Sequence, residues 1–318
     1  YQLRGRIDMN LVIVGIRAPG PPANVRGSMK FTGVSIQPPR AAKPMKNMDG
    51  EAVFTLAGRE ILVDSLLLNG LGGAVRAKGR IDLAKKPAQF AFDSKVRNVD
   101  LAELISLTPA GSRKRAEGKV NLDLLFGGQG TKWADMQHSI DGQGSLSILQ
   151  GVITDVNIIQ ALLGELGEQL GSSNFISEQM RSAYPHVFTA NKTVFKSIEG
   201  IIRIEKGTII APNLNLGTED YRLAGSGSIR LDRMVESKAT LILSQRLSKD
   251  VMQQVSLASM LADDKGQVQL PFTISGILPK AVVKPDLSGK IKAPPIAPEV
   301  DKLKKKLLDR LFPAKKKQ

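Results

Sequence analysis

The sequence lacks cysteine altogether and has few aromatic residues, which make up 4% of its 318 positions. The absence of cysteine excludes disulfides, thiolate metal sites and thiol nucleophiles. With Trp133 as the sole tryptophan, the chain also offers few rings on which nucleic-acid bases could stack. We therefore expect no nucleic acid among its partners.

Long hydrophobic runs are missing as well. No stretch approaches the roughly 18 apolar residues that a membrane-spanning helix needs, and no signal peptide is visible. The first residue, Tyr1, already stands inside a pattern of alternating apolar residues. We expect the natural N-terminus, and any membrane anchor, to lie upstream.

Catalytic and cofactor motifs are also absent from the sequence. His138 and His186 stand far apart, and neither has metal-ligand spacing around it. The glycine-rich stretch 225–230 lacks the third glycine of a dinucleotide fingerprint, and residues 118–120 end in valine where a phosphate-binding loop needs a hydroxyl. We expect a non-enzymatic protein without a catalytic site, a metal site or a cofactor.

What the sequence does contain is alternation of apolar and polar residues with a period of two. In residues 119–126, Val120, Leu122, Leu124 and Phe126 face one way, and Lys119, Asn121 and Asp123 face the other. This pattern predicts a β-strand with one wet face. Glycines at Asp49-Gly50, Asp141-Gly142 and Gly207 suggest hairpin turns between such strands.

One phrase of this alternating pattern occurs twice, roughly 150 residues apart, which indicates a modular unit that is used more than once. Its copies are Gly50–Leu56, Ser65–Leu68 and Gly79–Leu83, followed later by Gly200–Glu205, Asn213–Leu216 and Gly227–Leu231. The short spacing of the strands predicts an antiparallel, meandering sheet.

Two segments have a helical period and should pack on this sheet. The first runs from 155 to 170, with Asp155 as its expected N-cap, and the second from 248 to 261.

A third helix is expected over about residues 298–312, after a proline-rich linker. The formal net charge of the chain is +15, of which residues 302–318 carry +7. An apolar stripe beside lysines predicts a helix that lies on an anionic membrane surface, although a partner-binding helix or a solvated tail fits equally well. Its residues are Val300, Leu303, Leu307, Leu308 and Leu311, with Lys302, Lys304, Lys305 and Lys306.

The apolar faces of the strands allow two architectures. Two sheets could bury these faces against each other in a closed sandwich, or one curved sheet could keep an aliphatic face open for a ligand. Alternation alone cannot separate the two architectures. Without further evidence, we favour the sandwich because it is the more ordinary arrangement.

Several phrases resemble the C-terminal region of the AsmA family. They are Thr193–Gly200 followed by Gly225–Leu231, Gly144–Ile153 running into a helix, and Leu270–Pro279 with the exit Pro285-Asp286. The resemblance is strongest from Gly118 to Asp286 and weaker from Tyr1 to Val99. The family has no catalytic motif that could be matched to this chain.

The resemblance implies an envelope protein of Gram-negative bacteria that is anchored in the inner membrane by an N-terminal segment and extends through the periplasm. Family repeats are similar to those of bridge-like lipid transfer proteins, in which a long sheet forms an open hydrophobic groove. The implied partner is phospholipid, moved between the inner and outer membranes, with other envelope proteins as further partners. The alternative is a scaffold that supports outer-membrane assembly or protein biogenesis.

The resulting expectation is a mainly β protein: an elongated, curved, antiparallel sheet that forms an open hydrophobic groove, with a few short packing helices and a C-terminal amphipathic helix. We expect an N-terminal section over residues 1–117, a groove section over 118–286, and a linker with a basic helix over 287–318. Candidate groove residues, chosen by alternation, are Val120, Leu122, Leu124, Phe126, Ile202, Ile204, Ile229, Leu231, Leu241 and Leu243.

Overall fold

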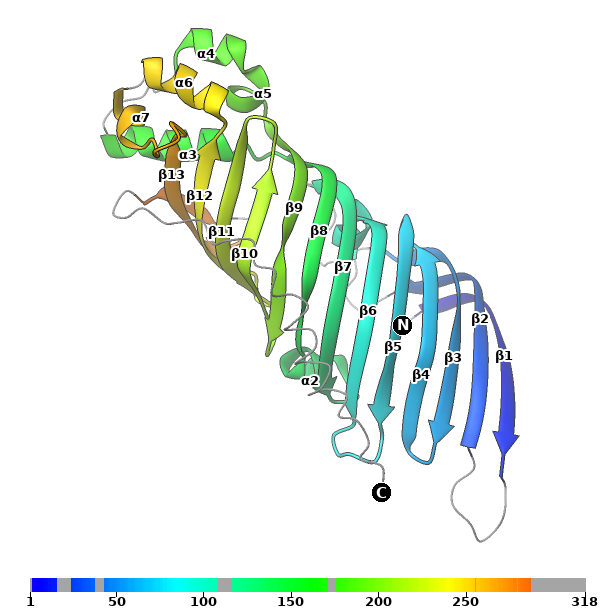
Figure 1. Cartoon of the computed structure of the whole chain (residues 1–318). Helices are drawn as coiled ribbons and strands as arrows, with labels where there is room; N and C mark the ends of the chain where they lie inside the picture. The colour runs from blue at the N-terminus through cyan, green and yellow to red at the C-terminus, as the bar shows by residue number, and fades with distance from the viewer. Residues whose placement is uncertain are drawn as a thin grey trace.

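A computed structural model describes residues 2–15, 24–37, 43–107, 116–170, 176–254, 256–278 and 280–286. These residues form one sheet of fourteen strands in which each strand pairs antiparallel with the next along the chain (Figure 1). The expected linker and basic helix at residues 287–318 lie outside the described residues. The strands are β1 (Gln2–Val14), β2 (Asn24–Gln37), β3 (Met45–Ala57), β4 (Glu60–Gly70), β5 (Gly73–Asp82), β6 (Gln89–Asp100), β7 (Ala116–Gln129), β8 (Asp141–Thr154), β9 (Lys192–Glu205), β10 (Thr208–Gly217), β11 (Tyr221–Arg230), β12 (Met234–Leu243), β13 (Gln269–Ile277) and β14 (Val282–Pro285).

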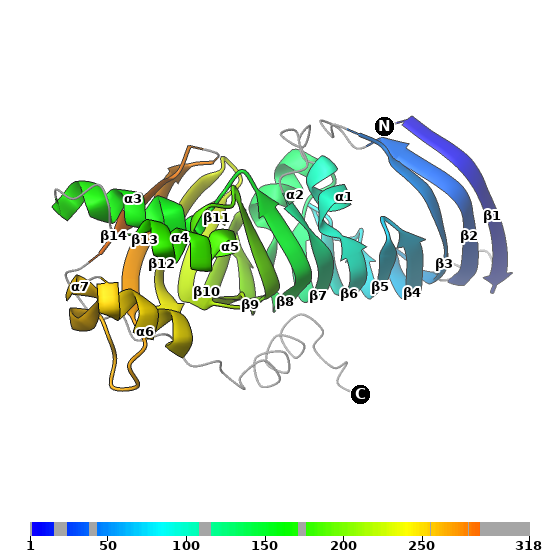
Figure 2. The same cartoon turned by 90° about the horizontal axis from the view of Figure 1, so that it is seen from above.

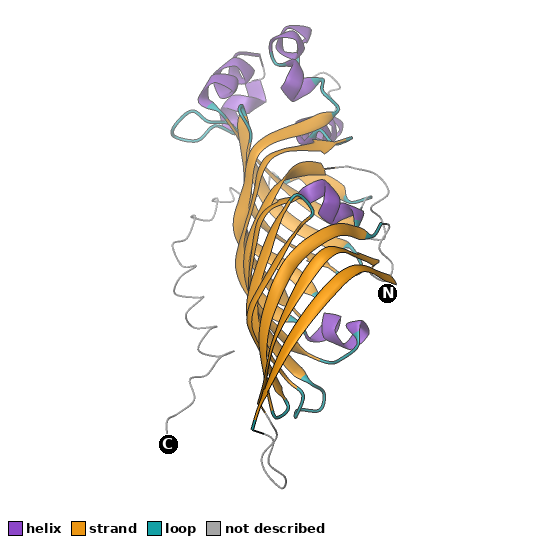
Figure 3. Ribbon diagram, turned by 90° about the vertical axis from the view of Figure 1, so that its right-hand side faces the viewer, coloured by secondary structure: helices purple, strands orange, loops and turns teal. Residues whose placement is uncertain are grey.

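The sheet is a single curved layer rather than half of a sandwich. Figures 2 and 3 show the strands arching so that one side of the sheet is concave. Every described strand belongs to this one sheet, so no second sheet covers either face within the described part of the chain. The closed-sandwich interpretation was therefore wrong, and the prediction of an antiparallel meander is confirmed. The expected division at residues 117 and 118 stays a prediction about sequence sections, since β7 continues across it.

The repeated phrase folds as two similar groups of three strands, β3–β5 and β9–β11. In each group the middle strand carries a β-bulge, which shifts the register between Val63 and Leu66 in β4 and between Ala211 and Leu214 in β10. A bulge strengthens the local twist of a sheet. The repeat therefore encodes the bend of the sheet as well as its apolar pattern.

Most of the strand glycines permit close approach between strands instead of forming turns. Gly50 and Gly142 lie inside β3 and β8, so the turns expected there are wrong, whereas Gly207 does lie in the β9–β10 turn with φ +81°. A Cβ atom on Gly144 would lie 1.8 Å from the carbonyl oxygen of Asp123 on the neighbouring strand. The curved sheet leaves no room for a side chain at that position.

We expect Gly144→Ala to destabilise the sheet by about 1–3 kcal/mol, because the added methyl forces β7 and β8 apart. Gly164→Ala is the matched control: Gly164 lies in a helix, and a Cβ there meets no atom within 4 Å. That change should be neutral or stabilising, since alanine is the better helix former. Urea unfolding of both variants tests this, and equal stabilities would contradict the close approach.

Five of the seven described helices gather at one end of the sheet, over the ends of β11–β13 (Figure 1). We call these five helices the cap: α3 (Ile158–Leu170), α4 (Glu178–Ala183), α5 (Pro185–Phe188), α6 (Gln245–Gln254) and α7 (Ser256–Met260). The other two are α1 (Leu101–Ser106) and α2 (Trp133–Ser139). Both predicted packing helices are present in the cap, the second as α6 and α7.

The first residues of the cap helices differ from the expectation. Asp155 adopts φ +60° and precedes α3, whose N-cap is Asn157, because the Asn157 side chain accepts a hydrogen bond from Gln160 N at 3.0 Å. Asn157 is buried and donates to the carbonyls of Val187 and Ala190. It therefore ties α3 to α5, a tertiary role that decides which residue caps the helix.

The cap and the end of the sheet share one hydrophobic core. Leu162 and Leu247 from the helices and Phe272 from β13 are buried in it. Tyr184, which follows α4, donates a hydrogen bond of 2.5 Å to Asp250 on α6. This bond, followed by burial, raises the pKa of the Tyr184 phenol, since both favour its protonated form. The hydrogen bond of Tyr184 thus connects α4 with α6.

Candidate functional site: the apolar face of the sheet

Directly paired residues on neighbouring strands point to the same face of a sheet, so the strand register shows which side chains lie together. Following these pairs from β1 to β14 gives one row in which every residue is apolar or glycine. We call it the apolar row, and the face on which it lies the apolar face. The row is Ile7, Phe31, Gly50, Leu68, Val75, Val96, Leu122, Leu146, Gly200, Leu214, Gly225, Ala239, Phe272 and Pro285.

The opposite face, which we call the polar face, is charged at the adjacent positions. The row beside the apolar row contains Asp8, Lys30, Glu51, Arg76, Lys95 and Asp123. Asp123 also forms an ion pair with Arg97, at 2.5 Å. Charged residues of β1–β3 and β5–β7 thus lie on the face opposite the apolar row, so that this part of the sheet has one face suited to water and one suited to hydrocarbon.

Nine of the ten candidate groove residues lie on the apolar face. Leu122, Leu124 and Phe126 on β7 and Ile204 on β9 are half-buried, and no second sheet covers them within the described residues, whereas Val120 and Ile202 are buried. Ile229 on β11 is half-buried too.

Three of the ten candidates have surroundings that alternation did not predict. Leu241 and Leu243 lie on the apolar face but are buried beneath the cap as part of its core. Leu231 lies beyond the end of β11, in the turn before β12, where 52% of it is exposed. The open part of the apolar face is therefore found on the strands before the cap.

The sequence analysis missed the contribution of the first six strands to the same face. Leu3, Ile7, Met9, Leu11 and Ile13 of β1 all lie on the apolar face and are 42–57% exposed. Their alternation was visible in the sequence. Their continuity with β7 was not, because only strand pairing brings them into one surface.

Three phenylalanines form a cluster near the middle of the apolar face. Phe92 and Phe126 are stacked with ring centroids 5.8 Å apart, and Phe90 lies 6.4 Å from each of them.

Helices α1 and α2 lie on the concave side of the sheet (Figures 2 and 3). Ser139 of α2 holds that helix to β7, because the backbone N–H of Gln129 donates a hydrogen bond to Ser139 Oγ at 2.9 Å. A Cβ on Gly128, which pairs with Phe90, would lie 3.1 Å from Ser139 Oγ, so α2 packs on the apolar face and that face is the concave one.

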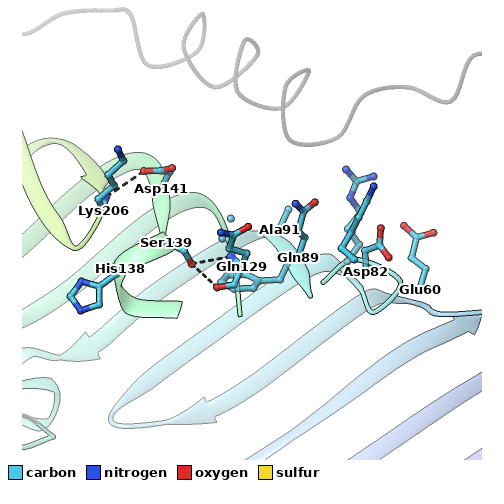
Figure 4. A pocket seen from close by; sticks show the side chains of 14 residues that line it. Glu60, Asp82, Gln89, Ala91, Gln129, His138, Ser139, Asp141 and Lys206 are labelled. Atoms are coloured by element: carbon cyan, nitrogen blue, oxygen red, sulfur yellow. Dashed lines mark hydrogen bonds between the residues drawn. The ribbon is translucent and has the colours of Figure 1, made fainter. Parts of the chain in front are cut away.

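A cavity of about 690 Å³ lies at the strand ends beside α2, and His138 and Ser139 of α2 are among the residues that line it (Figure 4). Charged side chains such as Arg80, Asp82 and Lys206 line it together with Phe90. Within the described part of the chain, no group of three or more histidines, aspartates or glutamates is placed to hold a metal ion. None of the described helices is long and apolar enough to cross a membrane.

The fold and its surface define a class of protein: a single open antiparallel sheet with one continuous apolar face and one charged face. The model of the AsmA family matches residues 43–229, more than half of the chain. The chain belongs to the AsmA family. Neither the curated proteins nor the solved structures contain a match to it. Membership fits a role in the bacterial envelope that is related to lipid transport.

Proposed function

We propose that this AsmA-family protein shields the acyl chains of phospholipids along its apolar face while the headgroups stay in water. It would thereby support movement of phospholipid between the inner and outer membranes without catalysing a reaction. The observation that carries the proposal is the apolar row, which passes through all fourteen strands without a polar residue.

The physical basis is the cost of exposing hydrocarbon to water. Burial of one CH2 group contributes about 0.8 kcal/mol, so an acyl chain that leaves a bilayer needs apolar contact along its whole path. With strands about 4.8 Å apart, fourteen strands laid flat would extend about 60 Å, far longer than one acyl chain. A surface of this length suits passage of lipids better than storage of a single one.

The proposal places the protein in the periplasm, held to the inner membrane by a segment upstream of this sequence. Other envelope proteins are proposed as partners, and residues 299–318 as a further contact with a membrane surface. The alternative, a scaffold for outer-membrane assembly, loses the closed sandwich on which it rested. It keeps a distinct outcome in the experiment below, namely protein cross-links in place of lipid cross-links.

The test is photocrosslinking from adjacent residues of β9 that lie on opposite faces. A benzophenone amino acid at Ile204, on the apolar face, should cross-link to phospholipid acyl chains in cells. The same group at Arg203, on the polar face, should not. Phospholipid should also be extracted from the gently purified protein. Absence of lipid from both measurements, with protein adducts at Ile204, would favour the scaffold.

A further inference from the structure

Two hairpin turns meet where β11–β14 end on the side opposite the cap. The β11–β12 turn and the β13–β14 turn are joined by a hydrogen bond from Leu278 N to Arg233 O, at 3.0 Å. We call this region the hairpin tip and define it by Leu231, Arg233, Ile277, Leu278, Lys280 and Val282. The backbone bond makes the two turns one surface.

The hairpin tip exposes aliphatic side chains that a water-facing turn does not need. Leu231 is 52% exposed, Ile277 51%, Leu278 38% and Val282 44%. At their opposite ends the same strands bury their leucines beneath the cap. Ile277 and Val282 pair with Met234 and Ser275 on the polar face, and Leu231 lies beside Gly207 of the β9–β10 turn. Exposed aliphatic side chains gathered at two joined turns are typical of an interaction surface.

The charges around the hairpin tip are mainly positive. Within residues 230–238 and 280–284, Arg230, Arg233, Lys238, Lys280 and Lys284 stand against Asp232 and Glu236, a net charge of +3. Arg230 pairs with Asp232 at 2.6 Å. Lys238 and Lys284 both flank Thr273 on the polar face. Cationic side chains thus surround exposed aliphatic ones.

We propose that the hairpin tip docks on an anionic lipid bilayer. Aliphatic residues surrounded by basic ones match the boundary between acyl chains and phosphate headgroups, where apolar burial and electrostatic attraction act together. A protein partner would need acidic groups around an apolar pocket, and a second copy of this chain would bring its own positive charge to the contact. Docking holds whether or not the apolar face carries lipid. Its use as a point of lipid exchange rests on the proposed function, which places lipid on the apolar face.

The absence of cysteine from the chain makes a site-specific test direct. Leu278→Cys and Val282→Cys, each in the full chain, are labelled with the polarity-sensitive fluorophore NBD and mixed with vesicles of phosphatidylcholine containing roughly 30% phosphatidylglycerol. Emission should shift to the blue and rise about twofold, and lipids with spin labels on the acyl chains should quench it, since the probe enters the bilayer boundary. Leu149→Cys is the control, because Leu149 has a comparable exposure of 37% on β8.

A pair of double variants tests the charges. Arg233→Glu with Lys280→Glu should weaken binding to the anionic vesicles about tenfold or more. Lys30→Glu with Lys46→Glu changes the net charge equally at exposed positions on β2 and β3, many strands away from the tip, and should have much less effect.

The outcomes separate the alternatives. Silent probes on protein that still floats with vesicles would overturn the proposal and assign binding to another segment, such as residues 299–318. A probe response that needs no vesicles and grows with protein concentration would show self-association instead. Equal losses of vesicle binding in the two double variants would show that binding depends only on the net charge of the protein, which would contradict docking by the tip. None of these results would alter the lipid cross-link expected from Ile204, so failure of docking and failure of the proposed function remain distinguishable.

Discussion

Under the proposed function, replacing Leu122 by aspartate should lower the transfer of phospholipid at least about tenfold, which corresponds to about 1.4 kcal/mol. Leu122 lies in the apolar row between Val96 and Leu146 and is half-buried. A carboxylate there must either stay hydrated in the path of an acyl chain or lose its water at a cost of several kcal/mol. Either outcome interrupts a surface that works only if it is continuous.

The matched control is Asn121→Asp, the preceding residue, which lies on the polar face opposite Ser147. It introduces the same charge in the same strand, and we expect it to leave transfer unchanged. Transfer is measured as movement of a fluorescent phospholipid between donor and acceptor vesicles, and circular dichroism checks that both variants keep their strands. Equal transfer by the two variants would show that the apolar face is not the path of the lipid.

Phe272→Ala should destabilise the capped end of the sheet by about 3–5 kcal/mol, the usual cost of removing a buried aromatic side chain. Phe272 is 1% exposed and belongs to the core shared by β13 and the cap. Because each strand contacts only its neighbours, as in repeat proteins, the loss should stay local. Hydrogen exchange should accelerate in β11–β14 and remain slow in β2–β6.

The control for this variant is Val194→Ala, since Val194 on β9 is 54% exposed and its truncation leaves little cavity. We expect a change within about 0.5 kcal/mol. If Phe272→Ala accelerates exchange equally in every strand, the sheet unfolds as one cooperative unit. The local character of the cap would then be wrong.

Local sequence patterns predicted individual strands and longer helices well, but short helices poorly. Residues 119–126 alternate as β7 requires, and the helical period over 155–170 corresponds to α3. Helix α1 has 6 residues and α2 has 7, too few for the apolar period that reveals a helix. Asp155 is not the N-cap of α3. Asn157 takes that position because its side chain also donates hydrogen bonds to Val187 and Ala190, and a local sequence pattern cannot reveal such tertiary contacts.

The sequence by itself determined that each strand has one apolar side and one polar side, because side-chain direction alternates with every residue of an extended chain. The sequence also indicated the AsmA family, because the phrases that resemble this family keep their order and spacing. Only the tertiary structure decided how those sides combine. Strand pairing aligned Ile7, Leu122 and Leu214 in one row, and the cap covered Leu241 while leaving Leu122 open. Both outcomes depend on contacts between residues distant in sequence, and a period of two is the same for a covered face and for an open one.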